Sequence, residues 1–154
     1  MNPLVQLVVF LLDARMYALR LSVVQRIVYA VDVTPLPSAP AIVLGVINVE
    51  GRVVPVINVR KRFALPGKGI GLNDHIIIAT TAKRPVALLT DSVSGVVEVS
   101  RNVVVDSSSI LPQVDYVEGV AKLPDGMVFI HDLDTFLSLD ENRALDEAIS
   151  QDQS

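Results

Sequence analysis

The feature that most constrains the fold of this chain is an internal repeat. When the sequence is displaced by 74 positions, Gly45–Phe63 lies over Gly119–Leu137 without a gap. Nine of the nineteen pairs are identical or similar: Gly45/Gly119, Val46/Val120, Val49/Leu123, Val53/Met127, Val54/Val128, Val56/Ile130, Asn58/Asp132, Val59/Leu133 and Phe63/Leu137. Both copies read as strand, tight turn, strand, Asn or Asp, and an apolar residue that opens a helical turn. Valine-rich hairpins also match by chance, but the ungapped register favours a duplicated β-unit.

The apolar segments are rich in valine and isoleucine and are separated by turn residues, a pattern typical of short, mostly buried strands. Ten strands are predicted: Leu4–Leu12, Met16–Leu21, Arg26–Val33, Gly45–Val49, Val53–Ile57, His75–Thr80, Val86–Thr90, Val96–Val99, Tyr116–Leu123 and Met127–His131. Three connections are short enough to close antiparallel hairpins: Asp13-Ala14, Glu50-Gly51-Arg52 and Pro124-Asp125-Gly126. The sequence therefore predicts an all-β protein.

Two longer connections and a change of period complete the pattern. Pro35–Pro40 is expected to lead into a helical turn at Ala41–Leu44, and Pro66–Gly71 is the predicted flexible linker. After the last strand the apolar spacing becomes helical. It predicts a short helix at Leu133–Leu137 and, behind a capping box of Ser138 to Glu141, a second helix whose polar end, residues 150–154, frays.

These elements predict two intertwined five-stranded β-barrels with a short C-terminal helical segment. Each sheet is too small to fold alone, so the two are expected to share an interface within a single domain over residues 1–149. The expected subdomains are roughly residues 15–80, and residues 81–137 together with the N-terminal strand 4–12.

Charge and composition exclude several classes of function. The chain has 13 Lys and Arg against 17 Asp and Glu, and a net charge of −4 disfavours nucleic acid as a partner. It has no cysteine, which excludes disulfides, Cys-ligated metals and a thiol nucleophile. The apolar run Leu4–Leu12 is too short to span a membrane and has no charged residue before it, as a secretory signal would. A cytoplasmic protein without direct membrane insertion is expected.

Candidate catalytic residues are few. His75 and His131 each lie beside an aspartate, but adjacent residues on a strand point to opposite faces and so do not pair. Asp132 and Asp134 lie two apart and could act as paired acids, whereas the repeat matches Asp132 with Asn58 and favours backbone capping. No catalytic residue, cofactor or metal is predicted. The alternative from a different class is a small metal-dependent hydrolase that uses His131, Asp132 and Asp134.

The run Gly45–Arg60, GVINVEGRVVPVINVR, closely resembles the signature of CheW-like domains. Further segments match that family's landmarks in the same order: Phe10, Tyr17–Leu19, Pro35–Pro40, Arg62-Phe63, Asp74–Ile78, Leu88–Val93, Ile110–Pro112 and Tyr116–Val120. The resemblance covers Leu4 to Leu139. It implies a pair of SH3-like barrels and a non-enzymatic adaptor of chemotaxis that couples chemoreceptors to the histidine kinase CheA. An auxiliary or pilus-type chemosensory pathway is the alternative setting.

The resemblance also implies partner-binding surfaces, with these candidate residues: Val24, Arg26, Ile27, Glu50, Gly51, Gly95 and Val97. Val24, Ile27 and Val97 are the candidate apolar anchors. Two charges depart from the family pattern, because Glu50 stands where an arginine is usual and Arg26 where an acidic residue is frequent. We predict that Arg26 and Glu50 face each other across the edge of the first barrel, as an ion pair or as a patch of altered specificity. Two unrelated surface substitutions are the alternative.

Overall fold

The computed structural model describes residues 4–29, 32–67, 69–71, 73–106, 117–124 and 126–153. In this part of the chain the strands are β1 (Leu4–Leu12), β2 (Arg15–Arg20), β3 (Val24–Tyr29), β4 (Val43–Val49), β5 (Arg52–Ile57), β6 (His75–Thr80), β7 (Pro85–Thr90), β8 (Ser92–Ser100), β9 (Val104–Asp106), β10 (Val117–Leu123) and β11 (Gly126–His131). The helical elements are η1 (Leu21–Val23), α1 (Val59–Arg62), η2 (Arg101–Val103), η3 (Leu133–Thr135) and α3 (Leu139–Gln153).

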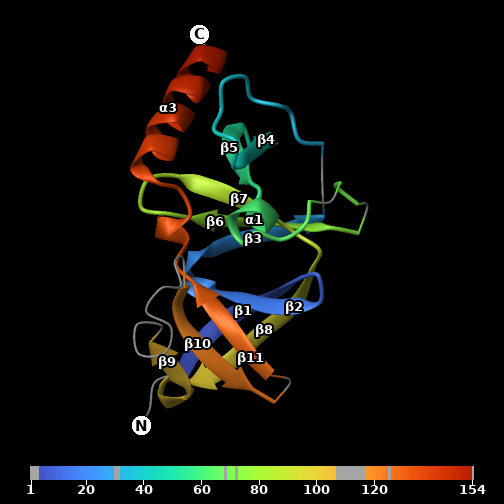
Figure 1. Ribbon diagram of the computed structural model, residues 1–154, viewed down its shortest axis with the longest axis vertical. Helices are drawn as coiled ribbons and strands as arrows, with labels where there is room; N and C mark the ends of the chain where they lie inside the picture. Colours follow the sequence, from blue (N-terminus) through green and yellow to red (C-terminus); the bar gives the residue numbers. More distant parts are fainter. Residues whose placement is uncertain are drawn as a thin grey trace.

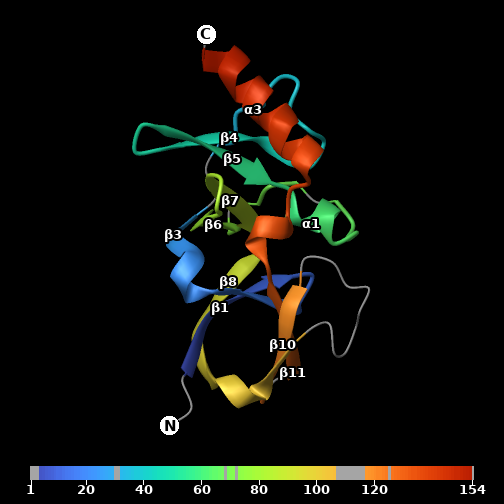
Figure 2. The ribbon, with the colours of Figure 1, turned by 90° about the vertical axis from the view of Figure 1, so that its left-hand side faces the viewer.

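The strands form two sheets, which lie one above the other in Figure 1. The six-stranded sheet has the order β8-β1-β2-β11-β10-β9 and is called the lower barrel here; the five-stranded sheet, β3-β6-β7-β5-β4, is the upper barrel. Neighbouring strands are antiparallel except β2 with β11 and β5 with β7, which are parallel. Both sheets curl, as Figure 2 shows, into the two SH3-like barrels that the sequence predicts.

The two halves of the chain exchange hairpins. The first hairpin, β1–β2, joins β8 to β11 of the second half in the lower barrel, and the hairpin β6–β7 joins β3 to β5 of the first half in the upper barrel. The repeat predicted from the sequence is present: β4–β5 and β10–β11 are equivalent hairpins, each with a register shift just before its first glycine. The barrels are therefore intertwined, as expected.

The exchange corrects the expected subdomain ranges. Residues 15–20 form β2 of the lower barrel, and residues 85–90 form β7 of the upper barrel. A two-residue turn holds β2 against β1, so β2 cannot leave its partner for the other sheet. The sixth strand of the lower barrel, β9, was not predicted; its counterpart in the upper barrel is a single bridge from Thr34 to Val46.

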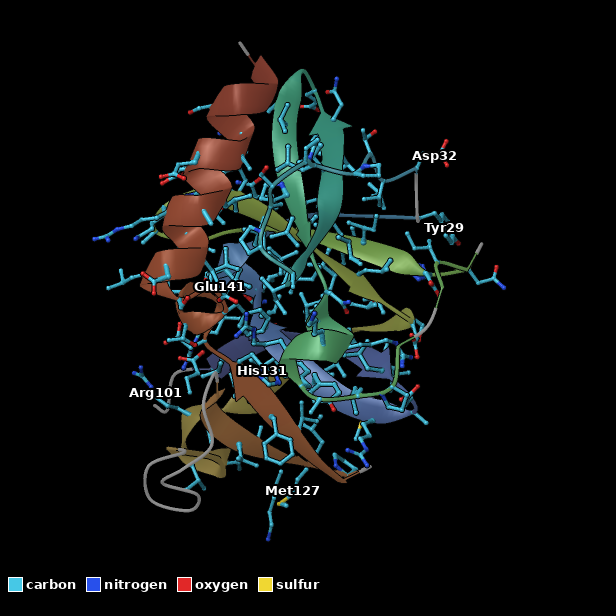
Figure 3. The ribbon with its side chains drawn as sticks, turned by 45° about the horizontal axis from the view of Figure 1, so that its top comes forward. Tyr29, Asp32, Arg101, Met127, His131 and Glu141 are labelled. Atoms are coloured by element: carbon cyan, nitrogen blue, oxygen red, sulfur yellow. The ribbon has the colours of Figure 1, made fainter. Side chains whose placement is uncertain are left out.

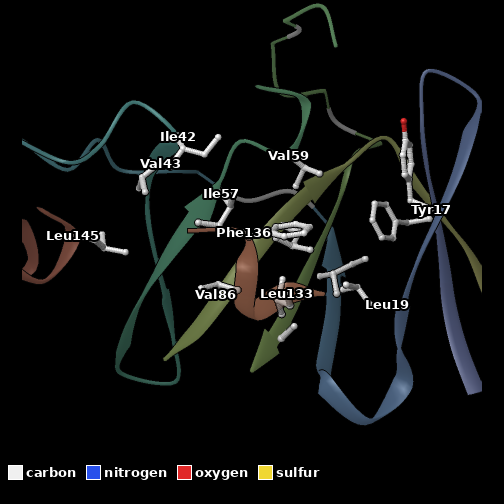
Figure 4. Packing of buried hydrophobic residues seen from close by; sticks show 14 of the residues in the cluster. Tyr17, Leu19, Ile42, Val43, Ile57, Val59, Val86, Leu133, Phe136 and Leu145 are labelled. Atoms are coloured by element: carbon white, nitrogen blue, oxygen red, sulfur yellow. The ribbon is translucent and has the colours of Figure 1, made fainter. Parts of the chain in front are cut away.

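Three hydrophobic clusters follow from this arrangement. One fills the lower barrel around Val128 and Ile130, and one fills the upper barrel around Val54 and Val56. The largest lies between the barrels and takes side chains from both sheets, η3 and α3 (Figure 4); its largest fully buried members include Phe10, Leu19, Ile57, Leu88, Phe136 and Leu145. Since most of the core is shared, each barrel depends on the other.

Several element predictions need correction. Residues 41–42 form a turn and β4 begins at Val43, so Ala41–Leu44 is not helical. The third strand begins two residues earlier than predicted, at Val24, and Val33 lies outside it. Helix α3 continues to Gln153 through the predicted polar tail, because polar residues without Gly or Pro do not end a helix. The landmarks Ile110–Pro112 and Tyr116, Asp125 of the third turn, and Ser154 lie outside the described residues.

Candidate functional site

Two of the predicted segments meet at one edge of the upper barrel. Arg26 on β3 and Glu50 in the β4–β5 turn form an ion pair, with 2.6 Å between Nη2 and Oε1. The exposed fractions of the two side chains are 47% and 70%, so the pair lies at the surface. The predicted juxtaposition is therefore present. Val24, Arg26, Ile27, Glu50 and Gly51 are called the upper-barrel edge below.

The turn that presents Glu50 has a defined backbone. Glu50 and Gly51 have φ angles of 52° and 82°, the left-handed pair of a type I′ turn. The Asn48 side chain supports it, because its Oδ1 accepts a hydrogen bond of 2.8 Å from the Gly51 amide. Beside the turn lies a hollow of about 120 Å³ lined by residues of β3 and the β4–β5 hairpin together with Ile78 and Pro85. The upper-barrel edge thus combines a pair of charged side chains with a concave surface.

The apolar part of the upper-barrel edge is small. Ile27 is 39% exposed. Tyr29 projects outward at the end of β3 (Figure 3), with its ring tilted against that of His75 and the ring centroids 4.7 Å apart. Val24 is half-buried and packs against the core between the barrels. β3 lies at the end of its sheet, with β6 as its ladder partner. Ile27 is therefore the exposed apolar residue among the predicted candidates on this strand.

The candidates on β8 belong to the other barrel. Gly95 lies at a bulge, where the register between β1 and β8 shifts. Val97 packs partly buried against the lower-barrel core, whereas Val96 is 54% exposed. Neighbouring strand residues face opposite sides of the sheet, so Val96 and not the candidate anchor Val97 is the more exposed of the two. Val96 is the outward apolar residue here.

An ionic cluster around the buried Arg60, not predicted from the sequence, joins the two barrels. Arg60 of α1 reaches Asp13 in the β1–β2 turn and Asp91 at the β7–β8 junction, each with Nη2–O distances of 2.7 Å. Its Nη1 donates to the Pro66 carbonyl at 3.0 Å, and the Asp13 amide donates to Asp91 Oδ2 at 2.9 Å. The hydrogen bonds to Asp13 and then Asp91 raise the pKa of Arg60 above its ordinary value. Arg60 therefore links the turns of both barrels.

The residues of the alternative hydrolase have structural contacts. Asp132 Oδ1 accepts from the Asp134 amide at 3.1 Å, and Asp134 Oδ1 accepts from the Ala82 amide in the β6–β7 turn at 2.7 Å. His131 is buried between the barrels, with its ring 4.3 Å from Phe63 and 5.3 Å from Tyr17 (Figure 3). Among the described residues, no three His, Asp or Glu side chains lie close enough together to hold a metal ion.

Glu141 holds the start of α3. Its Oε1 accepts from the Ser138 amide at 2.8 Å, and the Glu141 amide donates to Ser138 Oγ at 3.1 Å, which confirms the predicted capping box. Arg62 Nη2 contacts Glu141 Oε2 at 2.7 Å. Burial raises the pKa of the Glu141 carboxyl, but the bonds from Ser138 and Arg62 outweigh burial, and the pKa is lowered overall.

We expect the anchoring of α3 to weaken in acid. A carboxyl with a lowered folded-state pKa contributes stability that is complete above its unfolded value, about 4.3, and is lost as the pH falls through the folded value. Glu141→Gln should remove this part of the pH dependence, measured as the free energy of unfolding in urea between about pH 3 and about pH 7. Asp140→Asn, an exposed neighbour, is the matched control. An unchanged profile in Glu141→Gln would contradict the assignment.

Comparisons with known proteins show which family has this sequence and fold. A family model for the CheW-like domain matches residues 6–141. The chain is 27% identical over 146 residues to the chemotaxis protein CheW of Treponema pallidum, covering 91% of this chain and 86% of that protein. It is 28% identical over 141 residues to the chemotaxis protein CheW of Rhizobium meliloti, covering 90% and 91%. The structure matches the scaffolding protein TtCheW of Thermoanaerobacter tengcongensis with a TM-score of 0.82 and 29% identity, covering 92% and 96%.

These matches span both copies of the repeat and both barrels. Within the described residues, no helix combines the length and apolarity that crossing a membrane requires. The family signature from Gly45 to Arg60 contains the hairpin that presents Glu50 and the helix that carries Arg60. From the repeat, the exchanged hairpins and the match over residues 6–141, we conclude that this chain belongs to the CheW-like domain family.

Proposed function

We propose that this chain is a cytoplasmic, non-enzymatic adaptor that couples chemoreceptors to a CheA-type histidine kinase. Its relatives support the proposal, since two are named chemotaxis proteins and the solved neighbour is described as a scaffolding protein. The contacts of His131, Asp132 and Asp134 support a structural use of these side chains over a hydrolytic one. The adaptor needs no cofactor, and its net charge of −4 is unsuited to nucleic acid.

In this proposal the two barrels hold two partners at once. The receptor signalling tip binds the upper-barrel edge and the surface of β8 near Gly95 on the lower barrel, and the kinase's homologous domain binds barrel edges. The adaptor raises kinase activity by positioning, because binding both partners favours the active arrangement of the kinase. Interfaces of this kind have apolar centres and polar rims. Ile27 and Val96 suit the centre, and Arg26 and Glu50 suit the rim.

The observation that carries the receptor-binding part is the Arg26–Glu50 contact. It unites two segments that lie 24 residues apart in the sequence into one exposed edge. An exposed ion pair contributes only about 0–1 kcal/mol to stability, so partner selection is the better use of these charges. Their reversed signs favour a receptor whose facing charges are also reversed, and an auxiliary or pilus-type chemosensory pathway is the alternative setting for such a receptor.

The first test is binding of a purified receptor signalling-tip fragment and a CheA-type kinase to two isosteric variants of the turn. Gly51→Asn and Gly51→Asp strain the backbone similarly at a φ of 82°, with no atom within 4 Å of the added Cβ, but only the aspartate adds charge. We expect Gly51→Asp to weaken binding by about tenfold relative to Gly51→Asn. Wild-type protein that retains neither partner would refute the adaptor proposal.

A charge swap tests the ion pair itself. Glu50→Arg and Arg26→Glu should each weaken binding of the receptor fragment, and the double swap should restore part of it because the pair is re-formed with opposite polarity. The free energy of unfolding should change by no more than about 1 kcal/mol in any of the three. Calorimetric titration measures the first effect and urea unfolding the second. Purely additive losses in binding would contradict the coupling.

A further inference from the structure

A cavity of about 130 Å³ lies beside the start of α3. Its walls come from β5, from η3 and the residues after it, from the β6–β7 turn with the start of β7, and from the first turn of α3. The larger apolar side chains of its lining are those of Ile57, Val86, Leu133, Phe136 and Leu137. None of the candidate partner residues lines it. The cavity is therefore separate from the upper-barrel edge.

The internal repeat identifies the counterpart of this cavity in the other half of the molecule. β11 pairs in parallel with β2, and β5 pairs in parallel with β7, at matching positions of the repeat. This makes Ala18 the counterpart of Ala87, so the residues before them, Tyr17 and Val86, also correspond. The region around Tyr17 in the lower barrel is thus structurally equivalent to the region around Val86 in the upper barrel.

At the counterpart the space is filled by stacked rings. Phe63 lies 5.0 Å from Tyr17 and 4.3 Å from His131, and Phe10 lies 5.9 Å from Tyr17, all measured between ring centroids. Three of these rings have smaller counterparts, Leu137 for Phe63, Val86 for Tyr17 and Ala79 for Phe10, and the counterpart of His131 is the aliphatic Ile57. Leu137, Val86 and Ile57 line the cavity. The cavity exists because the same fold carries less side-chain volume on this side.

Three polar side chains at the rim of the cavity already form hydrogen bonds to other groups of the chain. Thr81 Oγ1 accepts from the Arg84 amide at 3.0 Å, and Asp134 accepts from the Ala82 amide. The Asn142 side chain donates to the Leu137 and Ser138 carbonyls. An exposed Lys83 remains, and an ammonium group is attracted to the face of an aromatic ring. This lining suits an uncharged ring better than a charged or strongly hydrogen-bonding ligand.

We propose that this cavity is a binding site for a small, uncharged, single-ring aromatic molecule. Its volume is close to that of the engineered apolar cavity of about 150 Å³ that binds benzene. The ring would lie beside Leu137, in the position that corresponds to that of Phe63 in the stack with Tyr17 and His131. The proposal is independent of the adaptor function, because it rests on the repeat and the lining alone.

The test is a titration of the full chain with phenol, followed by the methyl NMR signals of Leu133, Leu137 and Val86. We expect saturable shifts of these signals, and binding at least about tenfold weaker for cyclohexanol, which lacks the π face. Leu137→Phe should fill the cavity as Phe63 fills its counterpart, abolishing the shifts of Leu133 and raising Tm. Leu139→Phe, at an exposed position two residues away, should change neither.

Three results would overturn the proposal. One is the absence of saturable shifts in the wild-type protein; another is equal affinity for phenol and cyclohexanol; the third is unchanged phenol binding in a folded Leu137→Phe protein. If Leu137→Phe does not fold, Val86→Leu fills the cavity from the opposite wall and should weaken phenol binding in the same assay. The wild-type titration decides between binding and no binding without any variant.

Discussion

Replacing Arg60 by methionine is expected to lower the free energy of unfolding by about 3–5 kcal/mol, the usual cost of removing one member of a buried ionic cluster. Only 10% of the Arg60 side chain is exposed, and its guanidinium is the partner of Asp13 and Asp91 at the junction of the barrels. Without it, Asp91, whose side chain is only 24% exposed, loses a charged partner in a poorly solvated position. Methionine fills similar volume, so the loss reports the charge and the hydrogen bonds.

The carboxylate partners provide the controls for this prediction. Asp13 is better solvated, with 40% of its side chain exposed, so Asp13→Asn should cost less than Asp91→Asn, and both less than Arg60→Met. Urea unfolding at neutral pH measures the three changes. A loss below about 1 kcal/mol in Arg60→Met would show that the cluster does not hold the barrels together.

Gly45→Ala is expected to cost about 3 kcal/mol, the upper part of the range for overpacking. A Cβ at this position would lie 2.3 Å from the Thr34 carbonyl oxygen, which is backbone and cannot rotate away. That carbonyl accepts the Val46 amide at 2.8 Å, and the Thr34 amide donates to the Val46 carbonyl at 2.9 Å. Making room for the methyl group therefore pulls apart the bridge between Thr34 and Val46 at the edge of the upper barrel.

The repeat supplies the matched control, Gly119→Ala. Its Cβ would lie 3.0 Å from the Val105 carbonyl oxygen, a contact that a shift of a few tenths of an ångström relieves. We expect it to cost about 1 kcal/mol, the lower end of the same range. Urea unfolding of both variants measures the difference. Equal losses at the two glycines would contradict the steric explanation and point to a general requirement for glycine in both hairpins.

Most strands and turns of the fold could be predicted from local sequence patterns, but the pairing of distant strands could not. The repeat, the turns at Asp13-Ala14 and Glu50-Gly51, and the capping box of Ser138 and Glu141 depend on neighbouring residues, and the structure contains them all. The assignment of β2 and β7 to barrels depends on contacts between distant segments. An alternation of apolar residues shows that a strand exists, but not which strand pairs with it.

The candidate site likewise has one feature that the sequence predicted and others that it did not. The contact between Arg26 and Glu50 was predicted because the family resemblance placed both segments at one edge. The greater exposure of Val96 than of the candidate Val97 follows the bulge at Gly95, which simple alternation does not reveal. Arg60 was missed because its two partners lie 47 and 31 residues away in the sequence. A signal existed in the repeat, since Arg60 and Asp134 occupy the same position and each contacts a hairpin turn.

The exchange of hairpins between the two halves sets the order in which this chain can fold during its synthesis. β1 pairs with β8, so the first hairpin has to wait until residues 92–100 have left the ribosome. At about 5–20 residues per second this delay lasts several seconds, during which apolar strand edges stay unpaired. Pairings over such separations also fold slowly. The nascent chain is therefore exposed to aggregation before its release, and we expect its yield in cells to depend on chaperones.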